Sequence, residues 1–221
     1  MNSFNAFVQK NYTGNGSTPV WLGVVSPRPV GGVLVNAFHK AGLFLPAGTP
    51  VAYSEANRTI TPLVYFKVNQ YTSSTADTIN VDACVYGNEF LPAVGDAIMV
   101  VPSTFSGTGK AIAVTGVAKN FEGGYDVTIA HQGTPPCQAG DYLVIAAEAG
   151  SSKAMAVVPN AYLYNDICIN PTLNGEELVS VNASGSVVDF HAEGILINRT
   201  PAAAFATQMK AAVPGVMQST F

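Results

Sequence analysis

The sequence predicts a mainly β protein with antiparallel, barrel-like or sandwich-like units built from repeated hairpins, and with one short helix near the C-terminus. Three observations support this fold class. The apolar runs are rich in Val and Ile and are too short for typical helices. Turn residues, above all Gly and Pro, separate these runs. Only one stretch, at about 201–212, has the spacing of apolar residues that a helix requires. Since one hairpin cannot bury its own apolar face, several must pack together.

A pattern of turn followed by strand occurs three times, in residues 43–53, 91–101 and 135–145. In each copy a proline precedes a glycine turn, and a short apolar strand follows. The turn glycines are Gly48, Gly95 and Gly140, which lie 47 and 45 residues apart. A true structural repeat would have such a period. Turn chemistry common to any β protein would also produce it, so the sequence leaves both explanations open.

The remaining strands are expected wherever a short apolar run lies between turn residues. Residues 125–131 alternate apolar and polar side chains, which is typical of a half-buried strand. Gly123-Gly124 just before them marks a hairpin turn, and a last hairpin is expected across Ala183-Ser184-Gly185. The full set of expected strands is 50–54, 59–68, 77–86, 89–91, 96–101, 111–119, 125–131, 142–147, 154–158, 161–169, 178–182 and 186–197.

The helix prediction depends on the ends of the segment and on one apolar face. Thr200 is a good N-cap, and Pro201 suits the first helical position. Phe205, Met209 and Val213 recur every four residues, so they lie on the same face. A Pro-Gly pair directly after them ends the helix.

The composition favours a subunit of an assembly. Charged residues make up 11% of the chain, against about 25% in ordinary soluble domains, while 48% of the residues are hydrophobic. Such a surface suits a homo-oligomer better than a monomer. The net charge is −4 and no basic stripe occurs, so we expect no nucleic-acid partner. No apolar stretch reaches membrane-spanning length, and no signal peptide is recognisable, so we expect no membrane partner and synthesis in the cytoplasm.

The N-terminal region, residues 1–42, is expected to be an arm that anchors the chain on a partner. Residues 1–20 are polar and rich in Asn and Gly, so they have too little apolar surface to fold alone. An apolar run with the only Trp follows at once. The alternative is that this run is an edge strand of the chain's own core. The candidate anchor residues are Val20, Trp21, Leu22, Val24 and Val25.

Residues 43–217 are expected to form the β-rich body. The spacing of the repeats is compatible with two lobes. The base would combine about 43–95 with 170–221, and the outer lobe would be 96–169.

No catalytic, cofactor-binding or metal site is predicted. A phosphate-binding loop would need a first glycine where Thr104 stands and a Ser or Thr where Ala111 follows Lys110. Asp96 and Asp141 each follow a turn glycine, where a carboxylate caps the turn. The histidines and cysteines are too widely spaced for a metal site; they are His39, His131, His191, Cys84, Cys137 and Cys168.

Two stretches resemble the head decoration and head fiber proteins of tailed bacteriophages. Residues 45–53 (Leu-Pro-Ala-Gly-Thr-Pro-Val-Ala-Tyr), followed by Ile60-Thr61-Pro62-Leu63, resemble the family's opening and returning strands. Residues 192–201 are similar to its late strand, which leads into an Ala-rich helix and a turn, here Val213-Pro214-Gly215. The middle of the chain is longer than in the smallest decoration proteins, which favours inserted hairpins or a second lobe.

The resemblance implies a non-enzymatic structural protein of the phage head without cofactors. It would bind the major capsid protein lattice on the outside of the virion, as a homotrimer assembled in the host cytoplasm. A second interpretation is a carbohydrate-binding or adhesin-like β module on a virion or cell surface, in which exposed aromatic side chains would stack on sugars.

Overall fold

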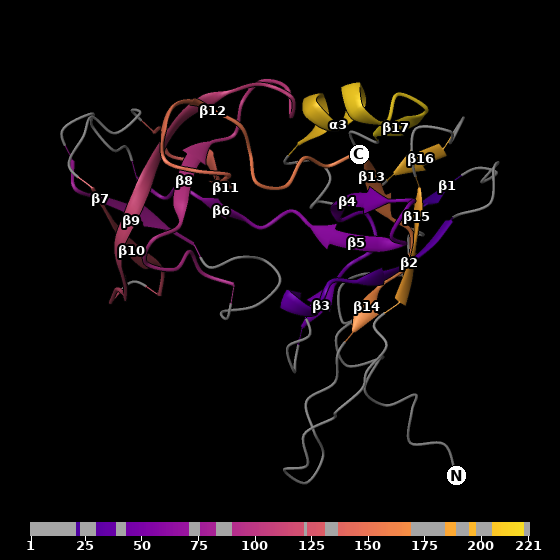
Figure 1. The fold of residues 1–221 in the computed structure, drawn as a ribbon, viewed down its shortest axis with the longest axis horizontal. Helices are drawn as coiled ribbons and strands as arrows, with labels where there is room; N and C mark the ends of the chain where they lie inside the picture. The colour runs from indigo at the N-terminus through magenta and orange to yellow at the C-terminus, as the bar shows by residue number, and fades with distance from the viewer. Residues whose placement is uncertain are drawn as a thin grey trace, which may run out of the picture.

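A computed structural model describes residues 21–22, 30–38, 43–70, 76–82, 90–121, 123–130, 137–168, 184–188, 195–197 and 205–218. The protein is mainly β, as predicted, with a short helix near the C-terminus (Figure 1). The strands are β1 (Trp21–Leu22), β2 (Val30–Leu34), β3 (Phe44–Leu45), β4 (Pro50–Ser54), β5 (Thr59–Pro62), β6 (Tyr65–Lys67), β7 (Thr78–Val81), β8 (Ala97–Val100), β9 (Gly109–Lys119), β10 (Tyr125–Ile129), β11 (Tyr142–Ala146), β12 (Gly150–Lys153), β13 (Ala161–Leu163), β14 (Ile167–Cys168), β15 (Ser184–Val188), β16 (Ile195–Ile197) and β17 (Val216–Gln218), and the helices are η1 (Asn36–Phe38) and α3 (Ala206–Ala212).

The first barrel is closed by five strands in the order β13-β15-β2-β5-β4. All its neighbours are antiparallel except β2 and β5, which are parallel. Gly32 allows β2 to approach closely, because a Cβ there would lie 2.9 Å from Ile60 Cγ1 and 3.0 Å from Tyr53 Cε2. The missing side chain of Gly32 therefore leaves room for the Tyr53 ring against β2.

The second barrel is built from the strand order β6-β11-β8-β9-β10-β7, with β12 paired to β9. The two end strands of this path meet through a bridge between Val68 and Val81. Asn69 N–H donates to Asn80 O at 3.0 Å, and Asp82 N–H donates to Lys67 O at 2.9 Å. These bonds join the end of β6 to β7, so the path of six strands closes on itself and neither of its end strands is left unpaired, as an exposed edge would be.

The second barrel is inserted between β5 and β13 of the first. Figure 1 shows β6 to β12 gathered on the left and the remaining strands on the right. The chain changes from one barrel to the other around Leu63-Val64 and again between Lys153 and Ala161. Sheet membership thus changes at these points and not at the lobe limits expected at 95/96 and 169/170, although the division into domains stays a prediction.

Two smaller ladders complete the half that holds the first barrel. In one, β16 pairs antiparallel with β1 and parallel with β17. In the other, β3 pairs antiparallel with β14. Because α3 lies between β16 and β17 in the chain, the helix is tied at both ends to this half.

The three repeated turns have the same local geometry. Gly48, Gly95 and Gly140 all have a positive φ, of 87°, 98° and 94°. Each glycine N–H donates to a strand carbonyl, and the N–H of that strand residue donates back to the carbonyl of the residue after the glycine. The strand residues are Leu163, Val114 and Val68. The turn of the repeated sequence pattern therefore recurs in the structure, which is compatible with a true repeat and with turn chemistry common to β proteins.

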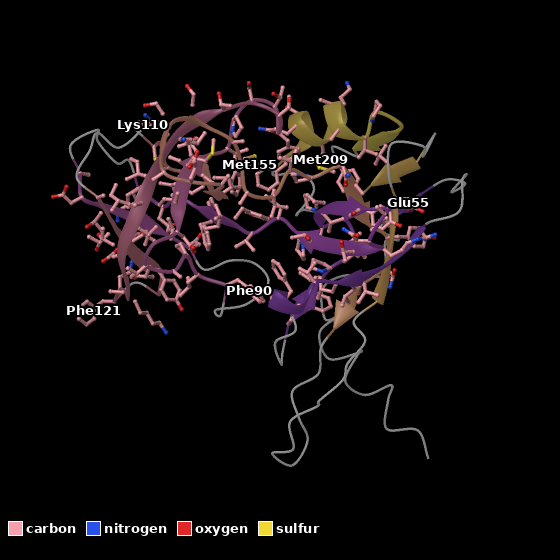
Figure 2. All side chains as sticks on the ribbon, in the orientation of Figure 1. Glu55, Phe90, Lys110, Phe121, Met155 and Met209 are labelled. Atoms are coloured by element: carbon pink, nitrogen blue, oxygen red, sulfur yellow. The ribbon has the colours of Figure 1, made fainter. Side chains whose placement is uncertain are left out.

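Aromatic contacts hold the two barrels together. Phe205, just before α3, is 1% exposed and packs edge-on against Tyr65 with ring centroids 4.7 Å apart. Its ring also lies 5.2 Å from Tyr142 and 6.0 Å from Phe105. Phe38 of η1 also stacks on Phe90, with ring centroids 5.3 Å apart, and Figure 2 shows Phe90 between the two halves. The buried residues form one continuous core.

The helix is confirmed where it is described. Phe205, Met209 and Val213 are all buried, as their spacing predicts. The described helix begins at Ala206, with Phe205 in the N-cap position and no side-chain cap. The expected start at Thr200 and Pro201 lies outside the described residues.

Several expected strands differ from the observed ones. The expected turn across residues 183–185 is wrong at Ser184 and Gly185, which belong to β15, where Gly185 faces Gly32. The expected strand 59–68 is split where the chain crosses between the barrels, and 161–169 is split into β13 and β14. At 154–158 the ladder is reduced to a bridge at Met155, because the chain leaves β11 for the first barrel. The described part of 89–91 is not a strand, and 178–182 lies outside the described residues.

Candidate interaction surfaces

The candidate anchor segment is described at two of its five residues. Trp21 and Leu22 form β1, whose backbone pairs with β16 through Trp21–Ile197 and Leu22–Leu196. Val20, Val24 and Val25 lie outside the described residues. β1 is an end strand of the order β1-β16-β17. Its pairing with β16 connects the candidate anchor to the C-terminal part of the chain.

A charged group lies at the turn between β4 and β5. Tyr53 O–H donates to Glu55 Oε2 at 2.6 Å, and burial, followed by this bond, raises the pKa of Tyr53. Arg58 forms an exposed ion pair with Glu55 at 3.3 Å, which contributes little stability in water. The Arg58 carbonyl accepts Val33 N–H at 2.7 Å. The backbone of Arg58 thus links the start of β5 to β2 in the first barrel, and its side chain links the same turn to Glu55.

A network of amide and carboxylate side chains lies on the second barrel. Asn69 Nδ2 donates to Asp82 Oδ1 at 2.8 Å and to Asn80 Oδ1 at 3.0 Å. Asn80 Nδ2 donates to Asp126 Oδ1 at 2.8 Å, and Asn120 Nδ2 donates to the same oxygen at 3.4 Å. Asn69 and Asp82 are exposed and the other three are half-buried. We call these five side chains the Asx network; sequence reasoning missed it, because its members come from four separate segments.

The hairpin between β9 and β10 carries an exposed aromatic side chain beside this network. Phe121 is 110% exposed, so its ring is not packed against the described residues. Figure 2 shows it projecting from the end of the second barrel. The Gly123-Gly124 turn expected from the sequence follows it, and Gly123 has a φ of 91°. The only sequence signal for this feature is an aromatic residue just before a hairpin glycine pair.

The remaining sequence candidates have structural roles or lie outside the described residues. Asp96 Oδ2 and Asp141 Oδ2 accept backbone N–H groups within their own turns, as predicted. Gly107 N–H donates to Thr104 O at 2.9 Å in an ordinary turn. Cys137 is buried. The three histidines and Cys84 are not described, and of Cys168 only the backbone is.

The described residues hold neither a candidate metal site nor a helix that could span a membrane. No group of three or more His, Cys, Asp or Glu residues there could hold a metal ion. No helix in that part of the chain is long and apolar enough to cross a membrane.

Comparison of the chain with protein-family models, with curated proteins and with solved structures gives no match.

Proposed function

We propose that the chain is a non-enzymatic structural component of a bacteriophage head, a decoration or head fiber protein that binds the major capsid protein lattice on the outside of the virion. The half that holds the first barrel would be the base on the capsid. The second barrel would project outward.

The arrangement of the candidate anchor is the observation that carries this proposal. The segment with Trp21 pairs with β16, which belongs to the stretch that resembles the end of the phage proteins. The opening stretch that resembles them forms β4 and β5, paired through Val51 and Pro62. Both stretches and β1 thus belong to the same half of the molecule, and the inserted second barrel accounts for the extra length between them.

The internal contacts also suit a structural role. The second barrel is closed into a ring, and each repeated turn is fixed by reciprocal backbone bonds. The two halves share one continuous core, with Phe205 as a contact between them. A rigid body that is held by burial, with a charged fraction of 11%, suits a protein that works by shape and by contact with neighbouring subunits.

Deleting residues 1–25 tests the anchor. The truncated chain should stay folded and oligomeric, because the described residues that it loses are those of the two-residue edge strand β1. It should no longer co-sediment with phage heads that lack the protein. A matched control is the deletion of residues 1–15, which keeps the apolar run and should still bind.

Two outcomes would count against the anchor. If the 1–25 deletion fails to fold, the segment is part of the core and the contact with the capsid lies elsewhere, for instance at α3 and the tail that ends at Phe221. The variant Trp21→Ser with Leu22→Ser keeps the backbone of β1, so it covers this case. If this double variant is folded and binds heads as tightly as the parent, the anchor proposal is wrong.

The same proposal includes a homotrimer. Sedimentation equilibrium at micromolar concentration should give three times the subunit mass of 22.9 kDa. A monomer under these conditions would contradict it.

A further inference from the structure

Hydrogen bonds between Asn120 and Gly124 close the β9–β10 hairpin that carries Phe121. Asn120 N–H donates to Gly124 O at 3.0 Å, and Gly124 N–H donates back to Asn120 Oδ1 at 2.9 Å. Gly124 itself is pressed against the barrel, since a Cβ there would lie 2.8 Å from Val81 O and 3.3 Å from Asn69 Nδ2. Asn120 and Gly124 are thus bonded to each other and packed on the barrel, while the Phe121 ring is exposed. Nothing in the packing of the chain requires an aromatic residue there.

The Asx network begins one residue from this ring. Its amide groups can each donate and accept, and its carboxylates accept with more than one lone pair. Both bonds described for Asp126 use Oδ1, and the bond to Asp82 also uses Oδ1. Donors and acceptors are therefore mixed over exposed and half-buried side chains, and one of these, Asn120, directly precedes Phe121 in the chain. Asp82 and Asp126 contribute two carboxylates to the network, and no Lys or Arg is among its five side chains.

The size of the apolar part narrows the choice of ligand. The other large exposed apolar side chains in the described residues are Val33, Val94 and Val158, which belong to other segments. A single Phe offers about 150–250 Å² of surface, against about 800 Å² for each partner in a stable protein interface. Stable membrane attachment through one inserted ring is also unfavourable, because binding strength scales with the buried apolar area.

One aromatic ring next to amides and carboxylates matches the two kinds of surface on a sugar. The C–H face of a pyranose covers an aromatic ring, and its hydroxyls each donate and accept hydrogen bonds. The carboxylates of Asp82 and Asp126 disfavour an anionic sugar through like-charge repulsion, so they favour a neutral one. We propose that Phe121 and the Asx network bind one ring of a neutral glycan. This goes beyond the proposed structural function, and either proposal can fail without the other.

The test uses the full chain on an array of neutral glycans (hexose, N-acetylhexosamine and fucose oligosaccharides) together with sialylated and sulfated ones. The glycan that binds best is then titrated by saturation-transfer NMR. We expect at least one neutral glycan to bind. Phe121→Ala should weaken its affinity by about tenfold or more, as expected from the loss of an aromatic contact. Phe121→Trp should retain binding. Asp82→Ala should weaken it by about tenfold as well, through the lost hydrogen bonds.

Val94→Ala is the matched control, because it removes another exposed apolar side chain, 69% exposed, from a different turn. It should leave binding unchanged. Phe121→Ala should keep the parent's melting temperature, since the ring is outside the core. Three results would overturn the proposal: no neutral glycan bound above the level of Phe121→Ala, preference for anionic glycans, or binding that Phe121→Ala leaves intact. If Phe121→Ala abolishes co-sedimentation with heads and no glycan binds, the tip is a protein contact instead.

Discussion

Replacing Phe205 with Ala tests how the two barrels are joined. The Phe205 ring is 1% exposed and meets Tyr65, Phe105 and Tyr142, which all belong to the second barrel or to its loops. The helix that follows it is tied to the other half through β16 and β17. Removal of the ring therefore leaves a cavity between the halves.

The expected loss of stability is about 3–5 kcal/mol, the usual cost of a buried Phe→Ala change. In a chain of this size each kcal/mol lowers the melting temperature by about 2–4 °C, so the shift should be about 6–20 °C. Phe205→Leu should cost less, because it fills part of the cavity.

The assay is urea unfolding followed by circular dichroism, with thermal melting as a second measurement. The control is Thr207→Ala on the exposed side of the same helix, which should change stability by no more than about 0.5 kcal/mol. A loss below about 1 kcal/mol for Phe205→Ala would mean that the aromatic cluster does not join the halves, and the reasoning would be refuted.

Two further predictions concern a backbone conformation and a buried thiol. Gly95→Ala and Gly140→Ala should each lower the free energy of unfolding, measured in urea, by about 1–2 kcal/mol. Both positions have a positive φ, and nothing lies within 4 Å of an added Cβ, so the cost comes from the backbone conformation alone. An unchanged free energy of unfolding would show that the turns relax to another conformation. Burial, with a smaller effect from Asp141, raises the pKa of the Cys137 thiol to about 11 from a usual value of 9.0, so the native protein should resist alkylation at this residue at pH 8, as measured by peptide mass spectrometry. The folded state holds the thiol proton more tightly than the unfolded state. The resulting contribution to the free energy of unfolding is therefore complete below about pH 9 and is lost as the pH rises to about 11. If a Cys137→Ala variant loses stability over the same pH range, the loss does not come from the Cys137 thiol.

Local features of the fold were predictable because they depend on a few neighbouring residues. The strand β4 was expected at its observed limits, since a glycine turn precedes it and a charged turn follows it. The positive φ of Gly95 and Gly140 follows from turn chemistry that the sequence displays directly. The buried face with Phe205 and Met209 follows from helical spacing.

The candidate surfaces were predictable only in part. An apolar run with the only Trp is visible in the sequence as a candidate anchor, although the pairing of Trp21 with Ile197 is not. Phe121 beside a glycine pair could be noticed as the tip of a hairpin. The Asx network could not, because Asn69, Asn80 and Asp126 meet only after β6, β7 and β10 come together.

The sequence alone determined the strand-rich character, the turn geometry and the apolar face of the helix, because side-chain alternation and backbone preference act over a few residues. The tertiary structure decided which strands pair. Gly185 has the local chemistry of a turn, but it lies in β15, where it pairs with Gly32 of β2. The insertion of one barrel into another and the packing around Phe205 were also decided at this level. Local preferences allow several strand pairings of similar energy, and the burial of apolar surface selects one of them.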